Sequence, residues 1–464
     1  MQKAIAKYGL AAHLAILAVA PLFLFPFFGE DTIAVVLLWL SLPAAVWTFM
    51  QPSVRRGEML HNARDRVSSE VFLDPFFWVM LVVVVFTGLR ALNSGVAMAY
   101  DAETAKWYMA SPVFPLLPAS VKDAGFLPFA ATLASMIIVI AGRHALGLKA
   151  RQSYFVISSA LAGVAAAIAA VLANLGNAVA AEAVKCPYRE LSFVGVAFLV
   201  HFVGAVVAVA AVIENRWNRV MPVMVISVGG TAAGSFIFSP AHDTGIFILA
   251  WLAVFAYAFF YLFRVVKGAA EFKMLIVLGV SLASGWALAM ITTSASVLSA
   301  RMTAFTDQVF FPEWFAAARR VLSALAIKAW MADPWTGTGI GSFALDIRFN
   351  AVPADWASIP RGLVDPPIGW LKLLTERGIA GAAMMALPLV LMLVTYGRRL
   401  VGWLFVRNAP QPGCWIGPVV VLAVVATGFF DCSYMRADVL MAVAGALAIS
   451  ASMFPKAEKG GNNG

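Results

Sequence analysis

The sequence predicts an all-α, polytopic membrane protein with about twelve transmembrane helices and one large loop outside the membrane. Three observations predict this fold. Of the 464 residues, 62% are hydrophobic and only 12% are charged, and a mean hydropathy of +0.87 is more than a soluble domain can bury. The apolar residues fall in runs of about 20, the length that a spanning helix needs. Basic residues gather in alternate connections between these runs.

The predicted spans follow from the apolar runs taken in order. The chain starts with basic residues and stays apolar to Phe28 with no small-residue cleavage site, which predicts a first spanning helix and not a cleavable signal peptide. The twelve predicted spans are residues 9–29, 32–50, 75–92, 126–142, 154–175, 191–213, 221–239, 245–265, 274–294, 378–396, 414–430 and 437–454.

The distribution of Lys and Arg predicts the orientation of these spans. One set of connections, together with the two chain ends, holds 19 of the 33 basic residues, whereas the short connections of the other set hold five. By the positive-inside rule both termini are predicted to be cytoplasmic. Orientation therefore explains the net charge of +9, and no nucleic-acid partner is predicted.

The three cysteines match no zinc or redox spacing, so no metal site is predicted. The topology places Cys186 and Cys432 on the outer face, where disulfides can form. The sequence does not show that these two residues approach each other.

The predicted spans divide the chain into three parts: residues 1–294 with nine spans, a large outer loop at 295–377, and residues 378–464 with the last three spans and a cytoplasmic tail. Within the loop, "PEWFAAARRVLSALAIKAW" predicts an amphipathic helix that Asp333-Pro334 ends. The glycines of "DPWTGTGIGSF" then permit a tight turn with exposed backbone N–H groups. "WLKLLTERGIAG" predicts a helix that resumes and runs into the tenth span.

Two roles for the glycine-rich turn follow from its composition. Its backbone N–H groups, with nearby arginines, can hold an anionic group such as a diphosphate at the membrane surface. Alternatively, the turn is a hinge that lays the amphipathic helix flat on the bilayer. It is not a Walker P-loop, because no Gly-Lys-Ser/Thr follows the glycines. The residue types leave both roles open.

The large loop resembles the signature of the O-antigen ligase and O-antigen polymerase family. That signature has an Arg, a Pro about fifteen residues later and a glycine-rich turn that ends in Phe. Arg319, Pro334 and Phe343 match it here, and Arg319 precedes Pro334 by 15 residues. The later family segment is matched by Leu371, Leu374, Glu376 and Gly378. About twelve spans, with the large loop before the last few, also resemble the family.

The resemblance implies a metal-independent glycosyltransferase of the bacterial inner membrane that uses no cofactor. Such an enzyme transfers a glycan from an undecaprenyl diphosphate carrier to an acceptor on the periplasmic face. Its implied partners are the lipid-linked glycan, membrane lipid and other polysaccharide assembly proteins. We expect a surface polysaccharide or exopolysaccharide polymerase slightly more than a ligase to lipid A core, because nothing in the chain marks a lipid A core acceptor.

The candidate catalytic residues are Arg319, His242 and Asp243. Where the family has His-Asn, this chain has Pro367 and Ile368, and His242 is the one histidine predicted on the outer face. Arg319 would neutralise the diphosphate leaving group, and His242 beside Asp243 would remove the acceptor proton. The candidate substrate-binding residues are Arg320, Arg189, Gly337, Gly339, Gly341, Arg348, Arg361 and Glu376.

Each candidate also has a structural explanation. Arg319 and Arg320 suit a solvated helix face or contact with lipid headgroups, and Glu376 suits the start of a helix. At the level of the whole chain, the alternatives to an enzyme are a polysaccharide transporter or flippase and a non-catalytic scaffold. The sequence shows no convincing repeat between halves, as many transporters have.

Overall fold

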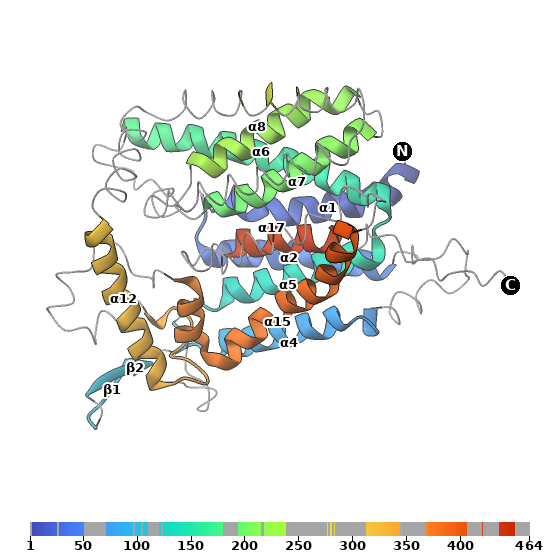
Figure 1. Ribbon diagram of the computed structural model, residues 1–464. Coiled ribbons are helices and arrows are strands. Elements are labelled where there is room, and N and C mark those ends of the chain that lie inside the picture. The colour runs from blue at the N-terminus through green and yellow to red at the C-terminus, as the bar shows by residue number, and fades with distance from the viewer. Residues whose placement is uncertain are drawn as a thin grey trace.

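A computed structural model describes residues 2–25, 27–50, 71–95, 98–103, 105–109, 120–121, 124–179, 194–214, 218–237, 312–343, 368–405 and 436–450, with isolated positions at 276, 279, 280, 283, 345 and 420. This part of the chain is mostly helical, as the sequence predicts. Its helices run side by side as a bundle, and one further helix lies across an end of it (Figure 1). The elements are α1 (Gln2–Leu24), α2 (Glu30–Met50), α4 (Pro75–Leu92), β1 (Met98–Asp101), β2 (Lys106–Met109), α5 (Phe126–Ile140), α6 (Leu148–Val179), α7 (Val194–Glu214), α8 (Met221–Ile237), α12 (Pro312–Ala332), α15 (Gly369–Phe405) and α17 (Ala437–Ser450).

Five helices in the described residues are long and apolar enough to cross a membrane: Glu30–Met50, Pro75–Leu92, Phe126–Ala145, Lys149–Ala169 and Gly369–Leu391. Shorter apolar helices cover Tyr8–Leu24, Ala197–Val209, Met221–Ser235 and Val439–Ala448. Each of these nine segments overlaps a predicted span. The spans predicted at 245–265, 274–294 and 414–430 lie almost wholly outside the described residues. The prediction of a membrane protein is therefore supported, whereas a total of twelve spans stays a prediction.

The prediction of an all-α chain needs one correction, a short hairpin after α4. Strand β1 pairs antiparallel with β2, and the register aligns Tyr100 with Trp107 and Asp101 with Lys106. Tyr and Trp favour a pleated strand, and the Tyr100 and Trp107 rings lie beside each other with their centroids 5.4 Å apart. The Asp101 side chain also accepts a hydrogen bond from the Glu103 backbone N–H at 2.9 Å, which favours the turn.

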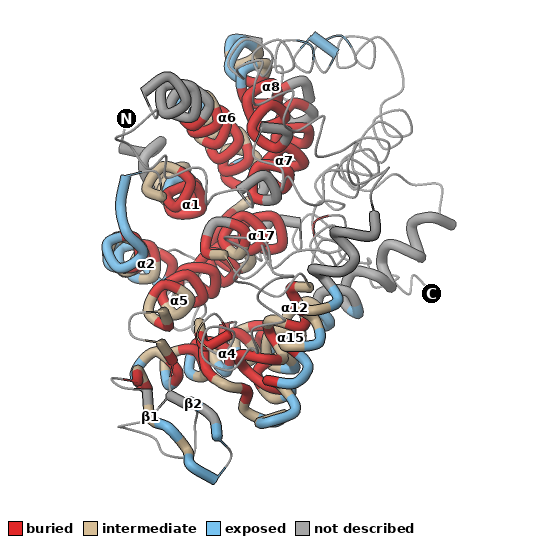
Figure 2. The backbone as a smooth tube through the Cα atoms, turned by 90° about the vertical axis from the view of Figure 1, so that its left-hand side faces the viewer, coloured by how far each residue is buried: buried red, intermediate tan, exposed pale blue. Residues whose placement is uncertain are grey.

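Small residues allow close helix packing between α6 and α8. A Cβ added at Gly230 of α8 would lie 2.6 Å from the Gly163 carbonyl oxygen of α6 and 2.8 Å from its Cα. Without hydrophobic driving force between helices in lipid, such backbone approach supplies the van der Waals contact that associates them. Seen end-on, buried residues gather where helices face one another, and α2 shows exposed residues on its outer side (Figure 2).

We expect Gly230→Ala to separate α6 from α8 and to destabilise the protein by about 1–3 kcal/mol, the usual range for overpacking. The new methyl group would meet backbone atoms, which cannot rotate away. Thermal unfolding of the purified protein in detergent measures the effect. Gly29→Ala is the matched control, because a Cβ there meets no atom within 4 Å. Equal melting temperatures for the two variants would contradict this packing account.

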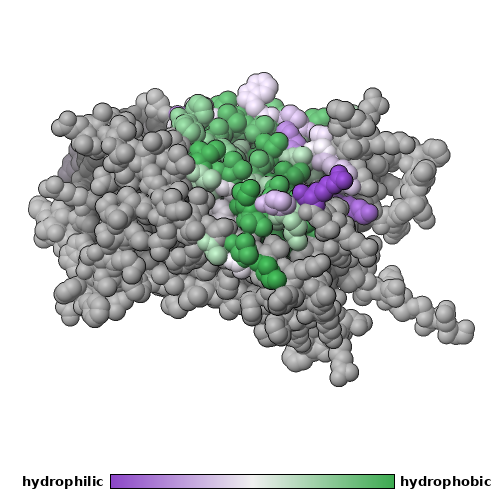
Figure 3. All heavy atoms as spheres, turned by 90° about the horizontal axis from the view of Figure 1, so that it is seen from above, coloured by the Kyte–Doolittle hydropathy of each residue, from purple (hydrophilic) through white to green (hydrophobic). Residues whose placement is uncertain are grey.

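The bundle has two distinct ends. Arg436, just before α17, lies over the Phe25 ring just after α1, with its Cζ 4.9 Å from the centroid. The start of α1 and the end of α17 therefore lie at the same end, and α12 crosses the opposite one (Figure 1). On the flank shown in Figure 3, apolar residues cover the middle of the described surface and hydrophilic residues gather toward the end where α1 starts.

Candidate functional site

The glycine-rich turn and the start of α15 bind each other through their backbones at the end of the bundle that α12 crosses. Thr338 N–H donates to the Thr375 carbonyl at 2.8 Å, and Gly339 N–H donates to the Glu376 carbonyl at 3.0 Å. In the other direction, Ile379 N–H donates to the Pro334 carbonyl at 2.9 Å. We call this unit, residues 333–343 with residues 369–380, the joint. It brings together the two halves of the signature.

Glycine is required where the two segments of the joint touch. Gly337 has φ +71° and Gly378 has φ +67°, a region that only glycine adopts readily. A Cβ at Gly337 would lie 2.4 Å from the Gly378 nitrogen, and a Cβ at Gly378 would lie 2.3 Å from the Trp335 carbonyl carbon. The helix that is predicted to run into the tenth span is therefore kinked at Gly378, because the turn packs against its backbone there.

Arg90 of α4 fastens the joint to the bundle. Its Nη2 donates to the Glu376 carbonyl at 2.7 Å and also to the Thr336 carbonyl, so one guanidinium holds both segments. The Arg90 residue is 0% exposed. Its own carbonyl accepts a hydrogen bond from Ser120 Oγ at 2.9 Å, and the neighbouring Val121 N–H donates to the Ile340 carbonyl at 2.9 Å. The segment before α5 therefore contacts the turn as well.

Side chains hold the joint against α12. Thr375 Oγ1 donates to the Leu371 carbonyl at 2.8 Å and lies 3.1 Å from the Ala326 carbonyl of α12. Asp333 accepts from Thr336 Oγ1 at 2.6 Å, which closes the turn. A small apolar cluster lies beneath these bonds: Leu322, Ala326, Phe343 and Leu371. The end of α12 is therefore fixed to the start of α15.

The charged groups of the joint nearly balance. The Arg90 charge is attracted by the carboxylates of Asp333 and Glu376 and repelled by Arg377. Glu376 and Arg377 are both 2% exposed. The Arg90 guanidinium can be buried here because two carboxylates attract its charge and two carbonyls accept its hydrogen bonds.

The structure brings four of the predicted site residues together. Gly337, Gly339 and Gly341 form the turn with positive φ angles, and Glu376 is buried beside them. The N–H of Gly337 donates to the Asp333 carbonyl at 3.0 Å, and that of Gly339 donates to Glu376. These two N–H groups are therefore engaged within the chain, which argues against a direct role for them in binding a diphosphate.

The other predicted site residues lie apart from the joint or outside the described residues. Arg320 is exposed on α12. Arg319 lies in the same helix, but its side chain is outside the described part. The remaining candidates, which lie outside the described residues together with Cys186 and Cys432, are Arg189, His242, Asp243, Arg348 and Arg361.

Sequence reasoning missed Arg90 and Arg377. Arg90 is the one charged residue in the predicted span 75–92, and an ionisable residue inside a span is a functional candidate by default. That signal was present in the sequence. Arg377 carries no such signal, because it follows Glu376 in a segment that reads as a polar helix surface. Among the described residues, no three His, Cys, Asp or Glu side chains come together as a metal site would need.

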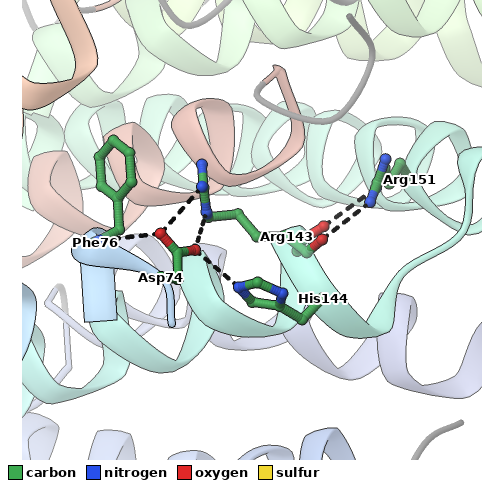
Figure 4. A network of polar contacts seen from close by, with 6 residues as sticks. Asp74, Phe76, Arg143, His144 and Arg151 are labelled. Atoms are coloured by element: carbon green, nitrogen blue, oxygen red, sulfur yellow. Dashed lines mark hydrogen bonds and ion pairs between the residues drawn. The ribbon is translucent and has the colours of Figure 1, made fainter. Parts of the chain in front are cut away.

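A second polar cluster lies at the opposite end of α4 (Figure 4). Asp74 caps α4 and lies about 24 Å from Arg90 along the helix, at 1.5 Å per residue. Its Oδ2 accepts from Arg143 Nε at 2.6 Å and lies 2.8 Å from His144 Nε2. Its Oδ1 accepts from Phe76 N–H at 3.0 Å. Arg143 and His144 belong to a π-helical segment, Ala141–Ala145, that continues α5, so this cluster joins α4 to α5.

This cluster predicts a loss of stability in acid. Burial raises the Asp74 pKa, but the hydrogen bonds from His144, Arg143 and the Phe76 backbone and the Arg143 charge outweigh burial and lower it to about 2. A carboxyl with a depressed pKa contributes stability above its unfolded value near 4 and loses it as the pH falls toward 2. The wild-type melting temperature should fall between about pH 4 and pH 2, because the free energy of unfolding decreases by about 2 kcal/mol. The melting temperature of Asp74→Asn should depend less on pH than that of the wild type. The same pH dependence in both proteins would contradict the prediction.

No family model matches the chain, and no curated protein shows significant similarity to it.

Proposed function

We propose that the chain is an inner-membrane glycosyltransferase that moves a glycan from undecaprenyl diphosphate to an acceptor on the periplasmic face. One observation supports the proposal most. The two halves of the large-loop signature are 28 residues apart in the sequence at their nearest named matches, Phe343 and Leu371, and they form one hydrogen-bonded joint. Two segments that match by chance have no reason to bind each other or to share one arginine of a membrane helix.

The joint places α12, the helix that carries Arg319, across the end of the bundle (Figure 1). The start of α1 lies at the other end, which agrees with a large loop on the face opposite the cytoplasmic termini. In the proposed reaction the diphosphate is the leaving group, so the protein has to neutralise its developing charge and orient the acceptor hydroxyl. Arg319 supplies the charge, because arginine stays ionised and binds phosphate oxygens through two N–H groups.

In this proposal His242 accepts the proton of the acceptor hydroxyl, and Asp243 orients the imidazole. The glycines take no direct part in binding the diphosphate. They allow the close backbone approach that fixes α12, so the joint positions Arg319 through the helix and does not touch the substrate. Arg189, Arg320, Arg348 and Arg361 remain the candidate contacts for the phosphates and the sugar.

Deletion of the gene, followed by sizing of surface glycans on gels, tests the function. Short repeat units in place of long chains would support the polymerase, which we favour. Long chains that stay on the carrier lipid would support the ligase. Lipid-linked units that accumulate on the cytoplasmic side would support a transporter and would overturn the proposal. Unchanged glycan length and attachment would also overturn it.

Arg319→Ala should slow glycan transfer at least tenfold in membranes that contain the protein. Losing a charge-assisted hydrogen bond costs about 1.5–3 kcal/mol, and about 1.4 kcal/mol corresponds to a factor of ten in rate. Arg319→Lys should recover only part of the rate, because an ammonium group cannot make the bidentate contact. Lys328→Ala, an exposed change on the same helix, is the control. Normal glycan length with Arg319→Ala would remove this residue from the mechanism.

A further inference from the structure

Large apolar side chains form an exposed row at the end of α12. Ile327, Met331 and Trp335 are 43%, 70% and 67% exposed. They recur every four residues, so they lie on one side of the helix and of the turn that continues it. Residues on other sides of the same helix, such as Leu322 and Ala326, are buried against the joint. We call these three exposed residues the α12 stripe.

The length of α4 sets the depth of the α12 stripe. Helix α4 has 18 residues and is therefore about 27 Å long, close to the thickness of the hydrocarbon layer, about 30 Å. Its end at Leu92 thus marks the boundary between hydrocarbon and headgroups. Arg90, two residues before that end, donates to the Thr336 carbonyl. The Trp335 residue that precedes Thr336 is therefore level with this boundary.

The α12 stripe also continues two apolar surfaces that face outward along the bundle. On α4, Val82, Val85 and Leu92 are 47%, 51% and 70% exposed. On α15, the exposed apolar residues are Ile379, Leu387, Val390 and Val394. Ala380 N–H donates to the Trp335 carbonyl at 3.2 Å, so the stripe adjoins the first turn of α15 after the kink. Surfaces of this kind on spanning helices contact lipid, and the stripe is continuous with them.

The polar residues beside the α12 stripe suit the same environment. Arg320 and Lys328 are exposed and lie within the same half of the helix as Ile327 and Met331. Long basic side chains extend toward lipid phosphates while their stems stay on apolar surface. Trp is enriched at the boundary between hydrocarbon and headgroups, the level at which Trp335 lies.

The geometry points to an α12 that lies in the bilayer interface, with acyl chains against the α12 stripe and phospholipid headgroups against Arg320 and Lys328. Part of the loop expected outside the membrane is then an interfacial anchor that holds the joint at headgroup level. The partner is the phospholipid bilayer. The inference does not depend on glycan transfer, because it follows from exposure, helix length and the hydrogen bonds of Arg90 and Trp335.

Spin-label accessibility tests the anchor in the full-length chain. Cys186, Cys414 and Cys432 are replaced by Ser, and single nitroxides are attached at Met331→Cys and Ile327→Cys in vesicles of phosphatidylethanolamine and phosphatidylglycerol. Collisions with oxygen report hydrocarbon, and collisions with a water-soluble nickel chelate report water. Val85→Cys, halfway along α4 and exposed, is the lipid control. Glu103→Cys, in the exposed turn of the hairpin, is the water control.

The oxygen-to-nickel accessibility ratio at Met331→Cys should be severalfold higher than at Glu103→Cys and lower than at Val85→Cys, and Ile327→Cys should agree. A ratio equal to that of Glu103→Cys would place α12 in water and overturn the inference. Low accessibility to both reagents would mean that protein covers the α12 stripe, which would overturn it as well. Wild-type-like elution of each labelled variant on size exclusion verifies that the protein remains folded.

Discussion

Gly378→Ala and Gly337→Ala should each open the joint and lower the free energy of unfolding by roughly 3–5 kcal/mol. Two costs combine at each position. A side chain at φ +67° or +71° is strained by about 1–3 kcal/mol. The added Cβ also meets backbone atoms at 2.3–2.4 Å, which no rotamer change relieves.

The glycine series contains its own controls. A Cβ at Gly341, φ +75°, would lie 3.1 Å from the Ala124 side chain, so Gly341→Ala should carry the backbone strain with little of the clash. Gly29→Ala should be nearly neutral. Limited proteolysis of residues 295–377 and thermal unfolding rank the four variants. A Gly378→Ala protein as stable as Gly29→Ala would show that the joint does not form as described.

The helices could be predicted from the sequence because the bilayer fixes their length. The predicted span 75–92 matches the bounds of α4, and the predicted span 32–50 differs from α2 by two residues at its start. The hairpin was missed for a related reason. Outside the bilayer the apolar runs stop, and the β-favouring pattern at Tyr100 and Trp107 is too short to predict a strand by itself.

The joint could be predicted only in part. The sequence showed that Gly337, Gly339 and Gly341 allow an unusual backbone and that a second motif ends at Gly378. It did not show that these segments bind each other. The bond from Thr338 to the Thr375 carbonyl spans 37 residues and uses a backbone acceptor, and every residue type offers the same carbonyl. The glycines therefore show that another segment can approach the turn closely. They do not show which segment it is.

The charged residues follow the same logic. Asp74 and Arg143 pair across 69 residues, and opposite charge alone does not select one partner among 33 basic residues. Arg90 was different, because the sequence already isolates it inside an apolar span. The physical reason is the high cost of a charge at that depth, so a charge retained there has a buried partner. In this chain the partners are two backbone carbonyls and a carboxylate pair.

Because a buried charge inside a span is costly without partners, we expect the Arg90 side chain to contribute strongly to the stability of the joint. Arg90→Met should destabilise the protein by about 3–5 kcal/mol, the usual cost of removing one partner from a buried charged network. The change removes the guanidinium donor from the Thr336 and Glu376 carbonyls. The Glu376 carbonyl keeps the Gly339 N–H, and a carbonyl left unpaired costs about 1–3 kcal/mol. Met has an apolar side chain of similar length to the aliphatic part of Arg. The loss of stability therefore measures the contribution of the guanidinium group and not the effect of a cavity.

Arg90→Lys separates the charge from the geometry. An ammonium group keeps the attraction of Asp333 and Glu376, but it lacks the planar fork that donates to two carbonyls at once. We therefore expect Arg90→Lys to recover less than half of the stability lost in Arg90→Met, measured by thermal unfolding in detergent. Lys328→Ala, an exposed charge on α12, should change the melting temperature little, since exposed charges contribute about 0–1 kcal/mol. If Arg90→Met and Lys328→Ala had the same melting temperature, the guanidinium would not hold the joint. Another contact would then have to attach α12 to the bundle.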